Sequence, residues 1–564
     1  ASRSYSNAAR APGAADTASS ADSGRDQQPE KKKKKVVVVG GGWAGFGAAK
    51  ALTEAGPYDV TLLDANPNPG GLSAGWRTSS GRSVEAGIKG FWWSYPNIYD
   101  LVERQLRVEN PFTDWTRSSF FSPDGLQVEA PVLNREQEFP SPLGLFVHTR
   151  GLFTSLPFAD RASMIPLLYA ILDFERDEET YREYDKMTAR ELFRRFGVSK
   201  RLYEEFLKPI LLVGLFAPPE ELSAGVVLGM LYFYVLAHQP DFDVRWCTGP
   251  ITEKLFAPLV DKIKANGGRV RGGMFVTDVT VDSKNKATSV QARNAEGGET
   301  VSFDADAVVL CVSIQGAKKL LSSCSGLGAA RPDLRRAMSL KSVDVMATRL
   351  WFDRKVMSIK NPSNVIAGFE NAVGGTFFHL NDLQDEYRDS EGSVIAADFY
   401  HASELLPLSD EEVTERVHRT YLSSCVPEFR RAQRACRVID SWVGRFPQAV
   451  TCFSPGSYEN RPRQASAGSN VFVAGDWVRG VDHGANGLSQ ERAYVTGLMA
   501  ANHVMDAFSG ATTSSRRATI LPTEPDEPQV AVGKRANKAV RGTLKSLGFP
   551  DLILDFTVFP PFLP

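Results

Sequence analysis

Three closely spaced glycines near the N-terminus have the spacing that most clearly implies chemistry. Gly40, Gly42 and Gly45 follow the β-branched run Val36–Val39, and a helical pattern over residues 48–55 comes after them. In a strand–turn–helix unit, such glycines let the backbone approach a pyrophosphate, and the helix N-terminus favours its negative charge. These residues therefore predict a dinucleotide-binding turn.

The next predicted strand supports this interpretation, and the residues after it narrow the choice of nucleotide. Asp59–Leu63 ends at Asp64, 24 residues after Gly40, where an acid can bind a ribose hydroxyl. Gly70 and Gly71 follow directly, and this resembles the Gly-Gly extension of FAD oxidoreductases of the amine oxidase and carotenoid desaturase superfamily. The resemblance implies FAD rather than NAD, with both glycines close to its phosphates and ribityl chain. Leu72 stands where that superfamily usually has a basic residue.

Further residues are similar to the plant and cyanobacterial phytoene and ζ-carotene desaturases. The matching positions are Trp76, Arg77, Glu85, Gly87, Ile88, Phe91, Trp92, Tyr95, Pro96, Asn97 and the strand Leu350–Lys355. The resemblance, which runs with gaps from about residue 36 to 507, implies that Arg77 contributes to the cofactor site. Lys89 departs from the pattern, because those enzymes carry histidine there.

The C-terminal half of the resemblance supplies the remaining cofactor residues. Gly475 and Asp476 are similar to a family signature whose aspartate reaches the flavin-side phosphate or the ribityl hydroxyls. A helix predicted to start near Ser489 implies that the Gln490 backbone N–H faces the flavin, although Arg492 replaces the usual glycine of this helix. Val276 is the expected adenine-binding residue by the same analogy.

Lys89 is the main candidate for a catalytic residue. A cation near the flavin would stabilise the reduced, negatively charged form or hold a water molecule. Pairing with Glu85 or Glu491, or exposure to solvent, are the alternatives. His483 is a weaker candidate. Cys452 lacks the Ser-Gly-Gly-Cys setting of covalent monoamine oxidases, so the resemblance implies non-covalent FAD.

Composition limits the other possibilities. Apolar residues make up 43% and charged residues 23% of the 564, which is typical of a globular protein. The net charge of −1 gives no field to attract nucleic acid. Six scattered cysteines without a CxxC pair, and seven histidines without close spacing, predict neither a disulfide framework nor a metal site.

These elements predict an α/β fold in which a Rossmann-type FAD-binding domain is interleaved with an α+β substrate domain. We expect a disordered leader in residues 1–35, because residues 1–30 lack Val, Ile, Leu, Met, Phe and Trp. The other expected units are the FAD domain (36–110, 245–325 and 468–508), the substrate domain (111–244 and 326–467), and a linker with a C-terminal segment (509–564).

The two ends of the chain suggest a location. The Ser-, Ala- and Arg-rich leader resembles the remnant of an organelle transit peptide; a plain flexible leader is the alternative. Lys534, Lys538, Arg541 and Lys545 share one predicted helical face, opposite Ala536, Val540, Leu544 and Leu547. This pattern, with the Phe-Pro tail after it, predicts either peripheral binding to an anionic membrane or docking on the protein's own domain. The uncharged stretch Leu222–Ala237 is too short to span a bilayer.

Three functions remain open. The resemblance implies an FAD-dependent desaturase or isomerase of a carotenoid-like isoprenoid, which transfers hydride to flavin N5 and uses a quinone as acceptor, peripheral on a plastid membrane. The alternatives are an amine or porphyrinogen oxidase that uses O2, and a non-catalytic flavin-bearing subunit of a plastid membrane complex.

Overall fold

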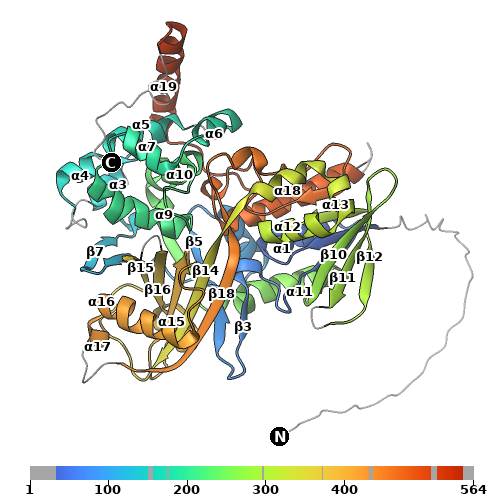
Figure 1. Cartoon of the computed structure of the whole chain (residues 1–564), viewed down its shortest axis with the longest axis horizontal. Helices are drawn as coiled ribbons and strands as arrows, with labels where there is room; N and C mark the ends of the chain where they lie inside the picture. Colours follow the sequence, from blue (N-terminus) through green and yellow to red (C-terminus); the bar gives the residue numbers. More distant parts are fainter. Residues whose placement is uncertain are drawn as a thin grey trace, which may run out of the picture.

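A parallel five-stranded sheet forms the centre of one domain in the computed structural model, which describes residues 33–149, 156–174, 177–294, 297–370, 373–430, 436–509 and 517–549 (Figure 1). The strand order is β19 (Val471–Val473), β13 (Ala307–Leu310), β1 (Lys34–Val39), β2 (Tyr58–Leu63) and β9 (Arg269–Arg271). All four β13 residues are buried, as are Val36–Val39 of β1. The predicted strands at 36–39 and 59–63 are confirmed, and the parallel order brings the carboxyl ends of β1, β2, β13 and β19 to one edge.

Two helices from opposite ends of the chain pack together beside this sheet. They are α1 (Trp43–Ala55) and α18 (Gln490–Phe508). A Cβ atom on Gly497 would lie 2.1 Å from the Ala44 carbonyl oxygen, and one on Gly47 would lie 2.8 Å from the Tyr494 carbonyl oxygen. Only glycine allows so close an approach, so the N- and C-terminal halves of the predicted cofactor site form one body.

The same domain carries further elements: α11 (Ala257–Ala265) and the antiparallel sheet of β10 (Met274–Val281), β11 (Ala287–Asn294) and β12 (Thr300–Asp304), followed by α12 (Ile314–Ser323) and α13 (Ser325–Ala330). Leu327, Leu334 and Leu340 share one apolar cluster with Val37. Residues 326–340 therefore pack on the domain of the five-stranded parallel sheet, which we call the nucleotide-type domain. The predicted boundary at residue 325 had assigned them to the substrate domain. Similarly, β1 begins at Lys34, one residue before the predicted end of the leader at residue 35; residues 1–32 lie outside the described part of the chain.

The second domain is a seven-stranded sheet with a helical layer above one end (Figure 1). Its strand order is β18 (Val438–Cys452), β14 (Lys341–Phe352), β17 (Val394–Tyr400), β16 (Val373–His379), β15 (Ser363–Glu370), β6 (Ser118–Ser122) and β7 (Gly125–Ala130). The main helices of the layer are α3 (Leu143–Thr149), α4 (Phe158–Ala162), α5 (Ile165–Asp173), α6 (Glu178–Tyr184), α7 (Ala189–Arg195), α9 (Lys208–Gly214) and α10 (Ala224–Leu231). α15 (Asp410–Arg416) and α17 (Pro427–Arg430) lie beside the sheet, and α14 (Leu380–Leu383) contacts β16 and β17. The predicted α+β character is confirmed.

The apolar stretch Leu222–Ala237 is part of this domain's core. Its α10 residues are all buried, and the chain continues as a π-helix from Tyr232 to Ala237 within the same apolar cluster. Among the described residues, no helix combines the length and hydropathy needed to cross a membrane.

Residues 517–527, which we expected to be a linker, run along both domains. Asn502 exchanges two hydrogen bonds with Ala518, and Asn97 exchanges two with Leu521. Further along, the Ser141 hydroxyl donates to Glu527 (2.8 Å) and the Tyr232 hydroxyl donates to Asp526. The segment therefore ties the nucleotide-type domain to the helical layer.

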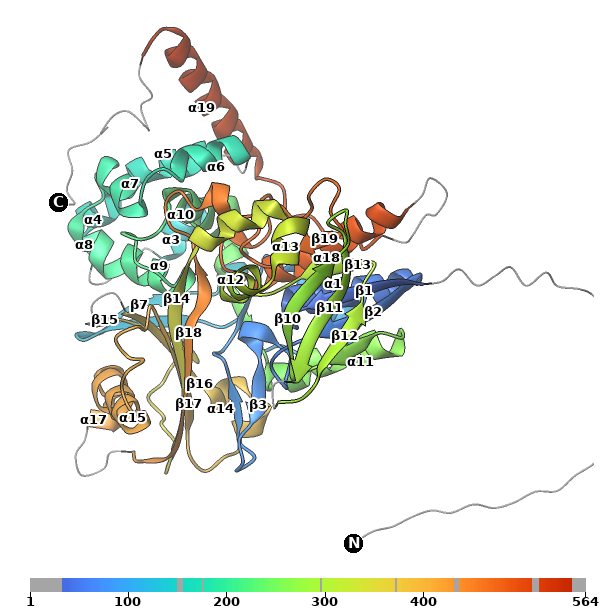
Figure 2. The same ribbon diagram turned by 45° about the vertical axis from the view of Figure 1, so that its right-hand side comes forward.

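Helix α19 (Pro528–Ser546) follows and projects beyond α5 and α6 (Figure 2). Of the predicted basic face, Lys534 is buried against the Tyr232 ring (4.0 Å to its centroid) and pairs with Asp526 (3.0 Å). Arg541 pairs with Asp173 of α5 (2.5 Å). The docking interpretation thus applies to these two cations. Lys538, Lys545, Val540 and Leu547 are exposed, and the Phe-Pro tail from residue 550 lies outside the described residues.

Candidate active site

The turn between β1 and α1 can be formed only by glycines. Gly40 has φ = +103°, and a Cβ atom there would lie 2.4 Å from the Cys311 carbonyl oxygen. A Cβ atom on Gly45 would overlap the Gly40 carbonyl oxygen at 1.8 Å. The first glycine therefore makes the turn, and the third lets α1 pack against the strand, as the motif requires.

The second glycine faces the Gly70–Gly71 loop. Gly42 is the N-cap residue of α1 and, having no side chain, makes no capping bond. Gly71 lies opposite with φ = +58°, and a Cβ atom there would lie 3.1 Å from the Gly42 Cα atom. The free N–H groups at a helix N-terminus attract anions. Two bare glycine backbones beside such an end fit the pyrophosphate of a dinucleotide.

Asp64 lies at the end of β2, against the same turn. Its carboxylate accepts hydrogen bonds from the N–H groups of Gly41 (2.5 Å) and Asn66 (2.7 Å). Burial raises its pKa, and these two bonds oppose that rise. The carboxylate is therefore held beside the glycine turn, where the predicted ribose contact requires it.

Two buried arginines fix the loop that follows Gly475 and Asp476. Arg492 of α18 donates to the carbonyl oxygens of Asp476 (2.9 Å), Val478 (2.6 Å) and Val481, and Arg461 also donates to Val478 (2.8 Å). Burial lowers the pKa of Arg492 to about 9. The arginine that replaces the family glycine thus holds the loop that carries Asp476.

Gln490 connects the segments that converge on this site. Its side-chain oxygen accepts from the Trp43 indole (2.9 Å) and its amide donates to the Gly90 carbonyl (2.9 Å). Ser489 is the N-cap of α18, which confirms the predicted helix start. Burial raises the pKa of Tyr95, whose hydroxyl bonds Ser489. The N-termini of α1 and α18 and the Lys89–Gly90 segment therefore meet at one place.

Lys89 lies in this place and is surrounded by buried polar groups. Its ammonium donates to the carbonyl oxygens of Ala86 and Gly87, both at 2.9 Å. Burial lowers its pKa, which Asp398 and then Glu85 oppose. Asp398 is 4% exposed, and burial raises its pKa to about 6. Lys89 is only partly exposed, and among the described residues it forms no ion pair with Glu85 or Glu491. Glu491 instead caps α2 (Pro96–Tyr99) through Asn97 and Ile98.

The groups around Lys89 leave several polar atoms without partners. Among the described residues, Asp398 Oδ1, Arg349 Nε and Gln384 Oε1 are buried and make no hydrogen bond. Arg349 and Gln384 both bond Glu85, at 3.4 and 3.1 Å. Unpaired buried polar atoms are rare, so their gathering here indicates a place for water or a polar group of a ligand.

The other predicted site residues lie in different surroundings. The Arg77 side chain is 41% exposed and pairs with Glu253 (2.7 Å) and Glu386 (3.1 Å). Val276 is buried on β10, opposite Ala292. His483 bonds the Leu521 carbonyl (2.8 Å) of the docked C-terminal segment. Cys452, at the end of β18, is buried, and burial raises its thiol pKa to about 11.

Sequence reasoning missed Asp398 and Arg461. Asp398 is the one charged residue in the apolar strand Val394–Tyr400, a signal that could have identified it. Arg461 lies in the irregular segment before β19, where the sequence offers no such signal.

Comparison with known proteins shows the family. The sequence model of the flavin-containing amine oxidoreductases matches residues 43–505. The chain belongs to this family. Solved structures of the family fold include cyclohexylamine oxidase from Brevibacterium oxydans, at TM-score 0.60 and 15% identity, covering 84% of this chain and 99% of that one. The protein is therefore an oxidoreductase with a flavin cofactor, and the predicted fold class is confirmed.

Curated relatives within this amine oxidoreductase family are carotenoid desaturases. The 15-cis-phytoene desaturase of Synechococcus elongatus is 24% identical over 78% of this chain and 89% of its own length. The probable zeta-carotene desaturase of the same organism is 24% identical over 83% and 97%. The chloroplastic/chromoplastic 15-cis-phytoene desaturase of Solanum lycopersicum is 24% identical over 78% and 72%.

Proposed function

We propose that the protein uses non-covalent FAD to desaturate or isomerise a carotenoid-like isoprenoid, with a quinone as electron acceptor. The observation that carries the proposal is the similarity to phytoene and ζ-carotene desaturases over 78% and 83% of this chain. The glycine turn, the Gly70–Gly71 loop, Asp64 and the Asp476 loop would hold the cofactor. The bound flavin would provide the hydride acceptor, while the protein orients the substrate and excludes water.

We assign Lys89 as the acceptor of the proton that a desaturation releases from the substrate. A desaturation removes a proton from the carbon beside the one that loses hydride, so the site needs an acceptor. Burial lowers the pKa of Lys89, and a neutral amine at this position would donate to Ala86 and Gly87 while keeping a lone pair for the proton. Asp398 stabilises the ammonium that forms, and its unpaired Oδ1 atom lies in the same polar group.

The protonated thiol of Cys452 supports the proposal that FAD is bound non-covalently. A cysteine attacks as its thiolate, and a thiol with a pKa of about 11 is almost fully protonated near pH 7. This buried cysteine therefore has low reactivity toward a flavin ring.

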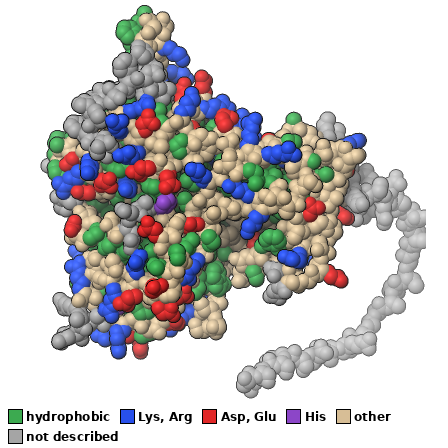
Figure 3. All heavy atoms as spheres, in the orientation of Figure 1, with side chains coloured by type: hydrophobic (Ala, Val, Ile, Leu, Met, Phe, Trp, Pro, Cys, Tyr) green, Lys and Arg blue, Asp and Glu red, His purple; other side chains and the backbone are tan. Residues whose placement is uncertain are grey.

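We further propose that the protein is peripheral on a plastid membrane. Several desaturases that match this chain are chloroplastic/chromoplastic by name. Val540, Leu547 and Phe549 are 52%, 67% and 57% exposed, on the part of α19 and its end that projects from the domain. Figure 3 shows apolar side chains at this projecting tip. An apolar helix end beside lysines fits the surface of an anionic bilayer.

Anaerobic reduction of the bound FAD tests the substrate. Polyenes, amines and a porphyrinogen are each added to the purified protein, and loss of the oxidised flavin spectrum is followed. We expect bleaching by a polyene and its reversal by a quinone. Bleaching by an amine or a porphyrinogen alone would assign an oxidase. No bleaching and no isomerised polyene, with FAD fully bound, would assign a non-catalytic flavin-bearing subunit.

A further inference from the structure

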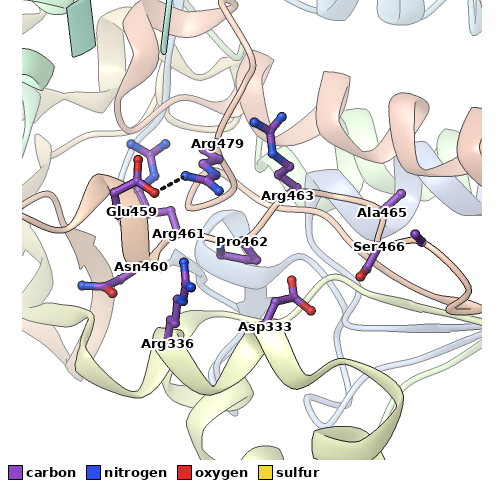
Figure 4. Close-up of a pocket in the computed structure, with 11 residues that line it drawn as sticks. Asp333, Arg336, Glu459, Asn460, Arg461, Pro462, Arg463, Ala465, Ser466 and Arg479 are labelled. Atoms are coloured by element: carbon purple, nitrogen blue, oxygen red, sulfur yellow. Dashed lines mark hydrogen bonds and ion pairs between the residues drawn. The ribbon is translucent and has the colours of Figure 1, made fainter. Parts of the chain in front are cut away.

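A basic pocket of about 280 Å³ borders the Asp476 loop, and apart from Arg461, which bonds that loop, its lining contains none of the residues used above for the flavin and the proton. It is lined by Asp333 and Arg336 of the 3-10 helix Pro332–Ser339, by the segment from Glu459 to Ala467, and by Arg479 of the Asp476 loop. Figure 4 shows these three segments around one opening. Residues far apart in the sequence therefore build it together.

The charges of the lining do not balance. Arg336, Arg461, Arg463 and Arg479 line the pocket together with two carboxylates, Asp333 and Glu459. Arg463 pairs with Glu178 and Arg479 with Glu459, which leaves Arg336 and Arg461 as two positive charges without an ion pair among the described residues. Both carboxylates already have partners. The buried Arg331 binds Asp333 through two hydrogen bonds of 2.8 Å, and Glu459 is shared between Arg479 (2.9 Å) and Arg182.

Two arginines have side-chain donors that no other described residue is seen to use. Arg479 Nε is buried and has no hydrogen-bond partner among the described residues. The exposed Arg336 side chain makes no ion pair within the described part of the chain, and Figure 4 shows it extending toward Asn460 and Pro462. Arg463 points away from this group and pairs with Glu178 (2.7 Å).

The wall behind these donors is rigid. Arg461 is 2% exposed, and its guanidinium donates to the Trp477 (3.1 Å) and Val478 (2.8 Å) carbonyls and stacks over Phe453 (4.9 Å to the ring centroid). Arg479 also donates its backbone N–H to Pro462 (3.1 Å). A site held in place before binding loses little entropy when a ligand arrives.

We propose that this pocket binds a phosphate group, carried by inorganic phosphate, a small phosphorylated molecule or a lipid headgroup. The guanidinium fork matches two oxygens of a phosphate. A phosphate dianion offsets the two excess positive charges, and the cavity volume accepts the group with a small substituent. Binding uses Arg336 and Arg479 as direct ligands, with Arg461 behind them.

Titration calorimetry of the full-length protein with inorganic phosphate tests the site. FAD is present in excess, so that phosphate cannot occupy the Gly42 turn, and ionic strength is held constant with chloride. We expect saturable binding that weakens about tenfold in Arg336→Gln, whose exposed side chain can change without unfolding the protein. The matched control is Arg535→Gln on α19, which should bind as the parent does.

Vesicle-binding experiments then identify the source of the phosphate. Vesicles with phosphatidic acid in phosphatidylcholine are compared with phosphatidylcholine alone, each with and without inorganic phosphate. Vesicle binding that needs Arg336 and is displaced by phosphate assigns a lipid headgroup. Phosphate binding without Arg336-dependent vesicle binding assigns a soluble ligand. No saturable heat, or equal affinity in the parent and Arg336→Gln, would overturn the proposal.

Discussion

Lys89 and Asp398 face each other across Gly87: Lys89 Nζ and Asp398 Oδ2 each lie 3.1 Å from the position that a Cβ atom on Gly87 would occupy. The glycine also has φ = +96°. Its missing side chain therefore lets a cation from the nucleotide-type domain and a carboxylate from the seven-stranded sheet share one small space. The separation of 309 residues between the two explains why their proximity is not evident in the sequence.

Gly87→Ala tests this arrangement. The new methyl group would push the two polar groups apart in addition to straining the backbone, so we expect a loss of about 3 kcal/mol in the free energy of unfolding. The control is Gly81→Ala, which has φ = +80° but no atom within 4 Å of its Cβ position, and should lose only about 1 kcal/mol. Urea denaturation measures both, and equal losses would show that Lys89 and Asp398 adapt freely.

The pH dependence of stability should report Asp398. Its folded pKa of about 6 lies above the ordinary 3.8, so its contribution is complete below about pH 4 and is lost as the pH rises through 6. The loss should reach about 3 kcal/mol by pH 8. We expect Asp398→Asn to remove this part of the slope between pH 4 and 8, while Asp124→Asn, in the turn between β6 and β7, keeps it. Lys89 and Arg349 lower the pKa of the Asp398 carboxyl and Glu85 raises it, so a slope that is the same in Asp398→Asn and in the parent would mean that the two cations keep the carboxyl ionised.

Gly42→Arg should abolish flavin binding, because its side chain would enter the space between the two glycine loops that fits the pyrophosphate. Gly542→Arg, at an open position of α19, is the control and should retain flavin. Acid precipitation followed by a spectrum of the supernatant measures release. A yellow pellet over a colourless supernatant would show covalent attachment, and absence of flavin from the parent protein would contradict the assigned cofactor.

Arg492→Lys should loosen the loop that carries Asp476. Lysine cannot reach the three carbonyl oxygens that Arg492 bonds, so we expect a loss of about 3 kcal/mol in the free energy of unfolding, with faster release of flavin. Arg517→Lys keeps an exposed ion pair with Asp506 and should change stability by less than about 0.5 kcal/mol. If the two variants behave alike, the loop does not depend on the guanidinium.

Membrane binding can be tested without disturbing the docked side of α19. The double variant Val540→Ser and Leu547→Ser removes exposed apolar side chains, each contributing up to about 2 kcal/mol on burial, and should reduce flotation with anionic liposomes. Val301→Ser, which changes a 40%-exposed valine on β12, should float as the parent does. Undiminished flotation of the double variant would remove α19 from the membrane proposal.

The sequence alone determined the cofactor class and the fold. The spacing of Gly40, Gly42 and Gly45 is a local property, and the backbone at Gly40 and Gly45 has room for no other residue. The strands at 36–39 and 59–63 and the helix start at Ser489 were predictable for the same reason, since turns, caps and buried runs depend on neighbouring residues.

Only the tertiary structure decided which side chains meet. The sequence identified Lys89 and Arg492 as departures from the family pattern, but it does not show their partners. Asp398 lies on a distant strand, and the three carbonyls that Arg492 bonds lie in an irregular loop 11 to 16 residues before it. Periodicity likewise predicted two faces of α19 without showing that Lys534 and Arg541 dock on the protein and leave Val540 exposed. A helical pattern specifies which residues share a face, whereas burial of that face depends on the complementary charges of Asp173 and Asp526, which chain folding brings to it.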